Sequence, residues 1–343
     1  MRLREFGQVA LSSAVPSRRT LAILVAAALV SGCAAGCGAG CKGRTEIVVF
    51  HASSLSRLFL DVGERFERAH PRYAIRAEPS GSQVAARKVS ELGLAADLVL
   101  SADIRVLDEL LVPGHADGTL GFATGEIVLA HAEHSRHTEE VSGRSWPEVL
   151  SRPSVRLGCV RPDLAPIGYQ TLLVWELVDG HWHGGIPPAL PARLSARCAP
   201  DHTVSDEAEL VALLEARAVD YAFLYRSTAE DHRLKLTELP AAVNLGRTEL
   251  APVYAEVEVE VPMSRGARTA IRGAPLLYGL AIPRKAVNPE GALLLATFLL
   301  GEEGRAALGR AGFRAVVPAT STAPDRLPPA LRRVVQLHER GVP

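Results

Sequence analysis

Short apolar runs alternate with stretches of helical spacing from residue 45 onward. The run TEIVVF at 45–50 has the continuous apolar character of a buried strand, and residues 58–68 then carry Phe59, Val62 and Phe66 on one helical face. The same alternation next predicts a strand at 73–77, a helix that ends at Glu91 and a strand at 96–103. The order β-α-β-α-β is typical of a mostly parallel sheet with helices on its faces, so the predicted fold class is α/β.

A second alternating set follows the first and predicts a separate α/β unit. It comprises strands at 125–131, 155–160 and 219–225 and helices at 171–178 and 205–216. Later come a strand at 275–284, a long apolar helical region at 288–313 and, in the tail after Pro318, a basic amphipathic helix at 327–341. The chain is therefore expected to build two α/β lobes.

The first residues read as an export signal. Arg18 and Arg19 precede the apolar stretch LAILVAAALV, which is too short for a comfortable membrane-spanning helix. The stretch ends at Cys33 in a sequence that resembles a bacterial lipobox, which implies cleavage before Cys33 and lipid on its sulfur. Residues 1–32 are then a lipoprotein signal peptide and 33–44 a flexible glycine-rich tether. The alternative is an ordinary secretory signal that is cut nearby.

Charge and cysteine content narrow the possible partners. Lys plus Arg and Asp plus Glu number 38 each, a balance that argues against broad nucleic-acid binding but permits a small anion held by local N–H groups. Cys37 and Cys41 lie in the tether, so a structural metal site is not expected. Cys159 and Cys198 lie in the folded part of an exported protein, where a disulfide can form, and the sequence leaves their pairing open.

Serines follow two neighbouring strands of the first set. Ser53 and Ser54 follow the first strand, and Gly81 and Ser82 follow the second and open its helix. Ligands bind beyond the carboxyl ends of parallel strands, and a helix N-terminus offers unpaired N–H donors and a partial positive charge. Each serine alone is explained by an ordinary N-cap. Together the two turns favour an anion cradle that needs no Lys or Arg.

The second set offers three further candidates. The segment APIGY, from Ala165, again follows a strand and opens a helix, where the N–H groups of Ile167 and Gly168 are candidate donors. Glu207 lies in the first turn of a helix, where an acidic residue is an ordinary partner of the helix dipole. Tyr225 ends a strand, and its phenol is a candidate donor to an oxyanion or a packing group.

Motifs for catalysis are missing from the sequence. It contains no HExxH zinc motif, no G-x-S-x-G elbow and no Walker A loop, and GSQVAA lacks the glycines of a dinucleotide fingerprint. An exported hydrolase using Ser54 or Ser82 stays an alternative only because His51 lies three residues before Ser54.

Several stretches, taken in order, carry a family resemblance: VVFHASSLSRLF, PSGSQVAARKVSELGLAADLVLSAD, FATGEIVLAH, APIGYQTLLV and YGLAIPRKAVNPEG. The chain resembles the molybdate/tungstate-binding proteins of ABC transporters, in particular their tungstate/molybdate branch, over residues 46–318. The resemblance implies a type II periplasmic-binding-protein fold with two α/β lobes, a ligand cleft and two crossover segments. Lobe one would comprise 45–124 plus 276–343 and lobe two 125–275, with hinge closure around the oxyanion.

The resemblance also implies roles for single residues. Ser54 and Ser82 match the family's two ligand serines, Tyr225 its tyrosine, and the turn from Ala165 to Gly168, with Ile167, a backbone contact. Glu207 aligns with a glutamate that ligates the metal centre of the bound anion. The family's second carboxylate is replaced here by Ala165. Glu207 then either ligates a metal centre of expanded coordination, faces a protonated anion, or turns away, and the sequence leaves these open.

The function implied by the resemblance is that of a non-enzymatic, extracytoplasmic solute-binding lipoprotein. It would capture molybdate or tungstate, without a cofactor of its own, and deliver it to an ABC permease. We expect a monomer that is anchored in the periplasm through lipid on Cys33 and does not bind nucleic acid. Because Ala165 departs from the family pattern, sulfate, phosphate or another small oxyanion is the alternative ligand.

Overall fold

The structure is a computed structural model that describes residues 43–181, 189–262 and 268–337. The predicted signal peptide, Cys33, Cys37, Cys41 and almost all of the tether lie outside the described residues. Residues from Arg44 onward form one compact unit. Among the described helices, none combines the length and the apolar character needed to cross a membrane.

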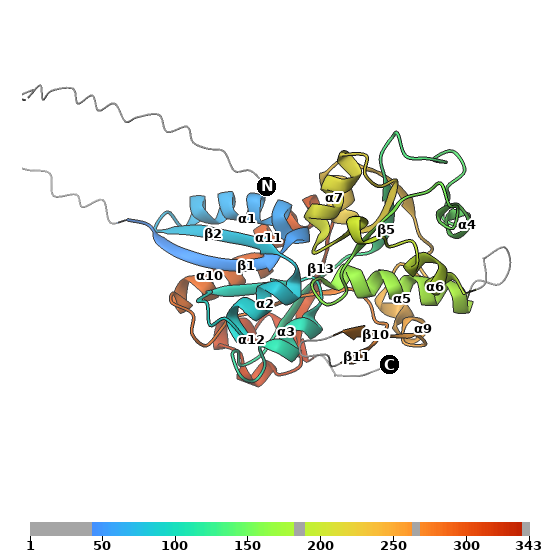
Figure 1. The fold of residues 1–343 in the computed structure, drawn as a ribbon. Helices are drawn as coiled ribbons and strands as arrows, with labels where there is room; N and C mark the ends of the chain where they lie inside the picture. The colour runs from blue at the N-terminus through green and yellow to red at the C-terminus, as the bar shows by residue number, and fades with distance from the viewer. Residues whose placement is uncertain (1–42, 182–188, 263–267, 338–343) are drawn as a thin grey trace, which may run out of the picture. The chain divides into compact units, whose positions relative to one another are not determined.

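Two larger sheets organise the described strands (Figure 1). The seven-stranded sheet has the order β14-β13-β4-β12-β3-β1-β2, and the five-stranded sheet has the order β7-β6-β8-β5-β9. The first sheet contains β1 (Thr45–Ala52), β2 (Tyr73–Ser80), β3 (Leu98–Ser101), β4 (Leu120–Thr124), β12 (Leu277–Ala281), β13 (Arg314–Ser321) and β14 (Val335–Leu337). The second contains β5 (Ile127–His131), β6 (Leu157–Val160), β7 (Thr203–Val204), β8 (Tyr221–Tyr225) and β9 (Lys235–Glu238).

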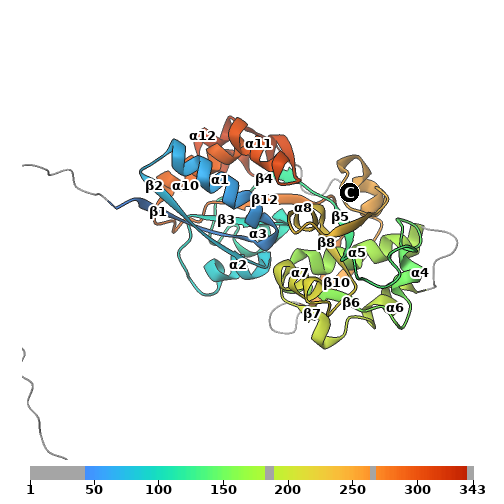
Figure 2. The same cartoon turned by 90° about the horizontal axis from the view of Figure 1, so that it is seen from above.

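Helices cover both faces of the first sheet (Figure 2). On one face lie α1 (Ser56–Ala69), α10 (Pro289–Leu300), α11 (Glu302–Arg310) and α12 (Pro329–Arg332), and on the other lie α2 (Ser82–Ser90) and α3 (Ile104–Leu110). Alternation along β1 explains this, because Ile47 and Val49 join the large core that includes Phe66 of α1. Phe50 points the other way and packs with Ala86 of α2.

The second sheet has its own helices and a small hairpin. They are α4 (Trp146–Leu150), α5 (Pro166–His181), α6 (Leu190–Ser195), α7 (Glu207–Glu215), α8 (Arg226–Asp231) and α9 (Ala251–Tyr254), with a hairpin of β10 (Glu258–Pro262) and β11 (Arg268–Arg272). Trp175 of α5 and Trp146 of α4 both pack edge-on against Phe223 in the middle of β8. These aromatic contacts fix the helices on the sheet.

The chain passes between the two sheets twice, once between β4 and β5 and once between β11 and β12. We refer to the part built on the seven-stranded sheet as lobe one and to the part built on the five-stranded sheet as lobe two. The α/β class with two lobes is therefore confirmed. The exact lobe boundaries given above stay predictions.

Three local expectations were wrong. The sheets are more mixed than the β-α-β order suggested, because β12 pairs antiparallel with both β3 and β4, while β1, β2 and β3 are parallel. The helical region at 288–313 is two helices separated by Gly301 in an extended conformation. Of the helix predicted at 327–341, Pro329–Arg332 is helical and Val335–Leu337 instead forms β14 beside β13, while 338–341 lie outside the described residues.

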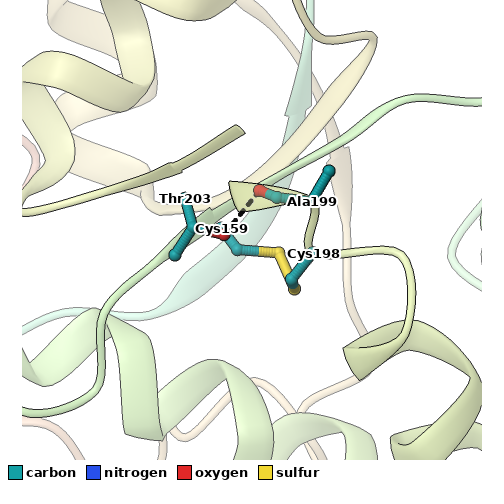
Figure 3. The surroundings of a disulfide bond; sticks show 4 residues. All are labelled: Cys159, Cys198, Ala199 and Thr203. Atoms are coloured by element: carbon teal, nitrogen blue, oxygen red, sulfur yellow. Dashed lines mark hydrogen bonds between the residues drawn. A yellow bond between two sulfur atoms is a disulfide. The ribbon is translucent and has the colours of Figure 1, made fainter. Parts of the chain in front are cut away.

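A disulfide joins Cys159 of β6 to Cys198, with 5.6 Å between their Cα atoms (Figure 3). Beside it, the Thr203 hydroxyl donates a hydrogen bond to the Ala199 carbonyl at 2.9 Å, and Thr203 pairs with Cys159 in the sheet. The covalent link closes a loop of 39 residues that contains α5. The pairing that the sequence left open is therefore present.

We expect the double variant Cys159→Ala/Cys198→Ala to lower the free energy of unfolding by about 2–4 kcal/mol, because closing a loop of this size restricts the unfolded chain. Urea unfolding followed by circular dichroism measures the loss. A reductant should destabilise the wild type and leave the double variant unchanged. Equal stability of the two proteins under oxidising conditions would contradict a stabilising disulfide.

Candidate functional site

A small cavity lies where loops of the two lobes meet. Lobe one lines it with residues at and just after the ends of β1, β2 and β3, and lobe two with residues at the starts of α5 and α7 and at the end of β8. The lining residues are Ala52, Ser53, Ser54, Ser80, Gly81, Ser82, Ala102, Ala165, Pro166, Ile167, Glu207 and Tyr225. The cavity thus brings together all five predicted ligand residues and three of the four supporting ones.

The two predicted ligand serines both face this cavity from buried positions. Ser82 is the first residue of α2, and its Oγ accepts a hydrogen bond from the Ala102 N–H at 3.0 Å, so its own hydroxyl hydrogen remains to be donated. The Ser54 Oγ is buried and makes no hydrogen bond of normal geometry among the described residues, although it lies close enough to the Glu207 carboxyl to act on its pKa. A buried hydroxyl without a partner is costly, so a ligand in the cavity would relieve that cost.

Neighbouring serines add to this wall. Ser53 donates from its hydroxyl to the Ser80 carbonyl at 3.5 Å, which ties the turn after β1 to the end of β2. The Ser80 hydroxyl lines the cavity and, like that of Ser54, has no hydrogen-bond partner in the described part of the chain. Ser80 was not among the predicted site residues, although its place in PSGS, two residues before Ser82, was a usable signal.

Gly81 allows the two lobes to meet. A Cβ atom at Gly81 would lie 2.3 Å from the carbonyl oxygen of Leu164 in lobe two, and real Cβ atoms do not approach so closely. The same Cβ would lie 3.2 Å from the Cβ of Ala165. Any larger residue at 81 would therefore push the two walls of the cavity apart.

The start of α5 supplies backbone groups from lobe two. Pro166 has no N–H, and Ile167 lies in the first turn, where N–H groups have no partner within the helix. The N–H of Gly168 instead donates to the Ala165 carbonyl at 3.0 Å, so only Ile167 offers a free donor of the predicted pair. Gly168 has a packing role, because a Cβ there would lie 2.7 Å from the Val160 carbonyl oxygen.

Tyr225 borders the cavity, but its hydroxyl already has a partner. That hydroxyl donates to Oε1 of Gln170, a buried residue of α5 that the sequence analysis did not single out. To donate to an oxyanion, the hydroxyl would have to leave Gln170. The backbone N–H of Tyr225 donates to Oε1 of Glu207 at 3.0 Å and so holds the Glu207 carboxyl in place.

Glu207 lines the cavity and does not turn away from it, with only 3% of its surface exposed. Burial raises the pKa of its carboxyl to about 8, while the N–H of Tyr225 and nearby hydroxyls act in the opposite direction. The Glu207 carboxyl is therefore mostly protonated and neutral at pH 7. Its neighbour Asp206 instead caps α7 by accepting hydrogen bonds from the N–H groups of Ala208 and Glu209.

The positive character of the cavity comes from the backbone alone. The lining residues, all within the described part of the chain, include no Lys and no Arg. Four described helices begin here instead: the short 3-10 helix Ser53–Leu55, α2, α5 and α7. Helix N-termini carry partial positive charge, which suits an anion, although Asp206 already accepts two of the first N–H groups of α7.

His51 does not serve Ser54 as a base. Its ring is buried, stacks on Phe59 at a centroid distance of 4.8 Å and donates from Nδ1 to the Ala52 carbonyl. Burial lowers its pKa to about 4, and it does not line the cavity. In the described residues there is also no group of three or more His, Cys, Asp or Glu side chains placed to hold a metal ion.

Comparison with known proteins gives a consistent family. The model of the family described as bacterial extracellular solute-binding protein matches residues 47–314. An uncharacterised solute-binding protein of Petrotoga mobilis is 35% identical over 84% of this chain and 89% of that protein. The molybdate/tungstate-binding protein WtpA of Pyrococcus abyssi is 33% identical over 83% of this chain and 89% of its own length.

Solved structures agree on the fold. The periplasmic molybdate-binding protein of Azotobacter vinelandii aligns with a TM-score of 0.57 at 15% identity, covering 78% of this chain and 98% of that one. The sulfate-binding protein SubI of Mycobacterium tuberculosis aligns with a TM-score of 0.55 at 15% identity, covering 80% and 88%. The resemblance drawn from the sequence and the type II periplasmic-binding fold are thus confirmed, and the chain belongs to the family of bacterial extracellular solute-binding proteins.

Proposed function

We propose that this protein captures molybdate or tungstate outside the cytoplasm and delivers it to an ABC permease. The observation that carries the proposal is one cation-free cavity that receives the buried hydroxyls of Ser54 and Ser82 from two helix N-termini. Hydroxyl and N–H donors hold a dianion without a formal counter-charge when water is excluded. The relatives named for molybdate and tungstate support the choice of ligand.

Ligand contacts in this proposal come from both lobes. Ser54 and Ser82 donate hydroxyl hydrogens from lobe one, and the Ile167 N–H donates from lobe two. Tyr225 contributes its hydroxyl once that group leaves Gln170, and Glu207 closes the cavity beside it. Ser53, Gly81, Ala165 and Gly168 shape the turns that carry these donors.

Ala165 bears on how many oxygen ligands the molybdenum or tungsten atom of the bound anion would have. A centre of expanded coordination needs carboxylate oxygens, and at this position the chain has a methyl group. Beside a neutral Glu207 carboxyl, the anion would keep its four oxygens, and size would decide selectivity. Sulfate and phosphate are smaller than molybdate and would leave donors unpaired, at a cost in affinity.

Cellular placement is part of the same proposal. Lipid on Cys33 would anchor the protein to a membrane face, and residues 33–44 would tether the two lobes. Lobe one would comprise 45–124 plus 276–343, and lobe two 125–275. A monomer that closes around its ligand would then dock on the permease.

Titration calorimetry of the purified protein with molybdate, tungstate, sulfate and phosphate tests the ligand class. We expect micromolar or tighter dissociation constants for the first two and binding at least about a hundredfold weaker for the others, because two unpaired donors cost this much. Tighter binding of sulfate or phosphate would show that one of these anions, and not molybdate or tungstate, is the ligand. A flat response to all four anions would contradict the proposal.

The substitutions Ser54→Ala and Ser82→Ala should each weaken molybdate binding by about tenfold to a hundredfold, since each removes a hydrogen bond to a charged group. Ser90→Ala is the matched control, because Ser90 lies at the other end of α2 and donates to the Ala86 carbonyl. Calorimetry gives the affinities, and thermal melting checks the fold. Unchanged molybdate affinity in both variants would contradict a role of Ser54 and Ser82 in ligand binding.

The substitution Glu207→Gln should leave molybdate affinity within about threefold of wild type at pH 7, because glutamine keeps the size and neutrality of a protonated carboxyl. Glu215→Gln, at the exposed end of α7, is the control. X-ray absorption of the bound metal should give four oxygen neighbours in both proteins. A large loss of affinity together with six neighbours in the wild type would instead make Glu207 a metal ligand.

A further inference from the structure

A buried hydrogen bond joins the two lobes beside the cavity. The Tyr169 hydroxyl, on α5 of lobe two, donates to Oδ2 of Asp103 in lobe one at 2.9 Å. The two residues are 2% and 3% exposed. Asp103 is the N-cap of α3, and its Oδ1 accepts the N–H of Arg105. Neither Tyr169 nor Asp103 lines the cavity.

Each partner is rigidly connected to one wall of the cavity. Asp103 follows Ala102, which lines the cavity and donates its N–H to the Ser82 hydroxyl. The hydroxyl of Ser101 accepts from the Asp103 N–H at 3.1 Å and donates to the Asp103 carbonyl at 2.6 Å, so this turn is stiff. On the other side, Tyr169 comes two residues after Ile167 in the first turn of α5.

Charge makes this contact stronger than a neutral hydrogen bond. Burial acts to raise the pKa of Asp103, but Arg105 holds it below its usual value by pairing with both carboxylate oxygens. Asp103 is therefore a charged acceptor at neutral pH, and burial keeps the Tyr169 hydroxyl protonated by raising its pKa. Arg105 also donates to the Arg272 carbonyl of β11 at 2.7 Å, a second link between the lobes.

Two further contacts from α2 join the lobes, and both are longer than the bond from Tyr169 to Asp103. Gln83 of α2 donates to the Pro162 carbonyl at 3.3 Å, and Arg87 donates to the Asp163 carbonyl at 3.2 Å. Both bonds end on neutral carbonyl groups, although the Arg87 donor is itself charged. Among these interlobe bonds of the described residues, the one between Tyr169 and Asp103 has both partners buried.

We propose that Tyr169 and Asp103 are positioning residues whose hydrogen bond locks the two cavity walls at the separation that fits the anion. The proposal rests on the proposed function, because it assigns the bond to the closed, ligand-holding state. The bond must break before the lobes part and the anion leaves. It therefore acts mainly on the rate of ligand release.

The substitution Tyr169→Phe tests the lock, because it removes one hydroxyl and keeps the ring. We expect dissociation of radioactive molybdate, measured by dilution into unlabelled molybdate, to be about tenfold or more faster than in the wild type. The association rate should stay within about threefold, because only the fraction of ligand-free protein that is already closed must break the bond before it binds. Asp103→Asn should also speed dissociation, because it replaces the charged acceptor with a neutral one.

Tyr221→Phe is the matched control. Tyr221 is also buried, and its hydroxyl donates to the Arg136 carbonyl within lobe two. Its loss should lower the melting temperature without changing either rate. Dissociation from Tyr169→Phe at the wild-type rate, or equally faster dissociation from Tyr221→Phe, would overturn the lock.

Small-angle scattering of the ligand-free proteins separates this inference from the proposed function. If the wild type binds no oxyanion, the proposed function fails, and scattering then decides the lock alone. We expect Tyr169→Phe to have a larger radius of gyration than the wild type and Tyr221→Phe, because its lobes open more readily. Equal radii in a protein that binds no oxyanion would overturn the lock as well.

Discussion

Buried polar groups need hydrogen-bond partners. In this protein several buried donors line one cavity whose described lining residues include no Lys or Arg. Four helix N-termini and the hydroxyls of Ser54 and Ser82 converge on the same small cavity. The arrangement is electrostatically incomplete until something negative fills it. The sheet topology serves this constraint, because it places the turns after β1, β2 and β3 along one edge of lobe one.

The separation of the two lobes determines whether the donors of both can reach one anion in the cavity. Gly81 lets the backbone of one lobe reach Leu164 of the other, and the bond from Tyr169 to Asp103 holds the contact beside the cavity. Among the described residues that line the cavity, Glu207 is the one acidic residue, and its raised pKa limits repulsion of a dianion at neutral pH. The charge of the cavity, the distance between its walls and the closure of the two lobes therefore depend on one another.

Local sequence patterns predicted the two lobes, and together with the family resemblance they predicted several residues that line the cavity. Ser54 and Ser82 were found because parallel strands end at a common edge, so residues that follow them must lie close together. Pairing between distant segments was not visible. The antiparallel place of β12, the strand β14 inside a predicted helix, and the bond between Tyr169 and Asp103 all depend on contacts between segments far apart in the chain.

Side-chain partners were also beyond the sequence. Tyr225 was predicted to face the ligand region, and it does line the cavity, but nothing in its neighbourhood indicated that Gln170 would accept its hydroxyl. A crystal structure of the tungstate complex tests the central claim most directly, because the anomalous signal locates tungsten. The account predicts tungsten inside the cavity, with its oxygens within hydrogen-bonding distance of the Ser54 and Ser82 hydroxyls and the Ile167 N–H. Tungsten bound elsewhere, or serine hydroxyls turned away from it, would contradict the account.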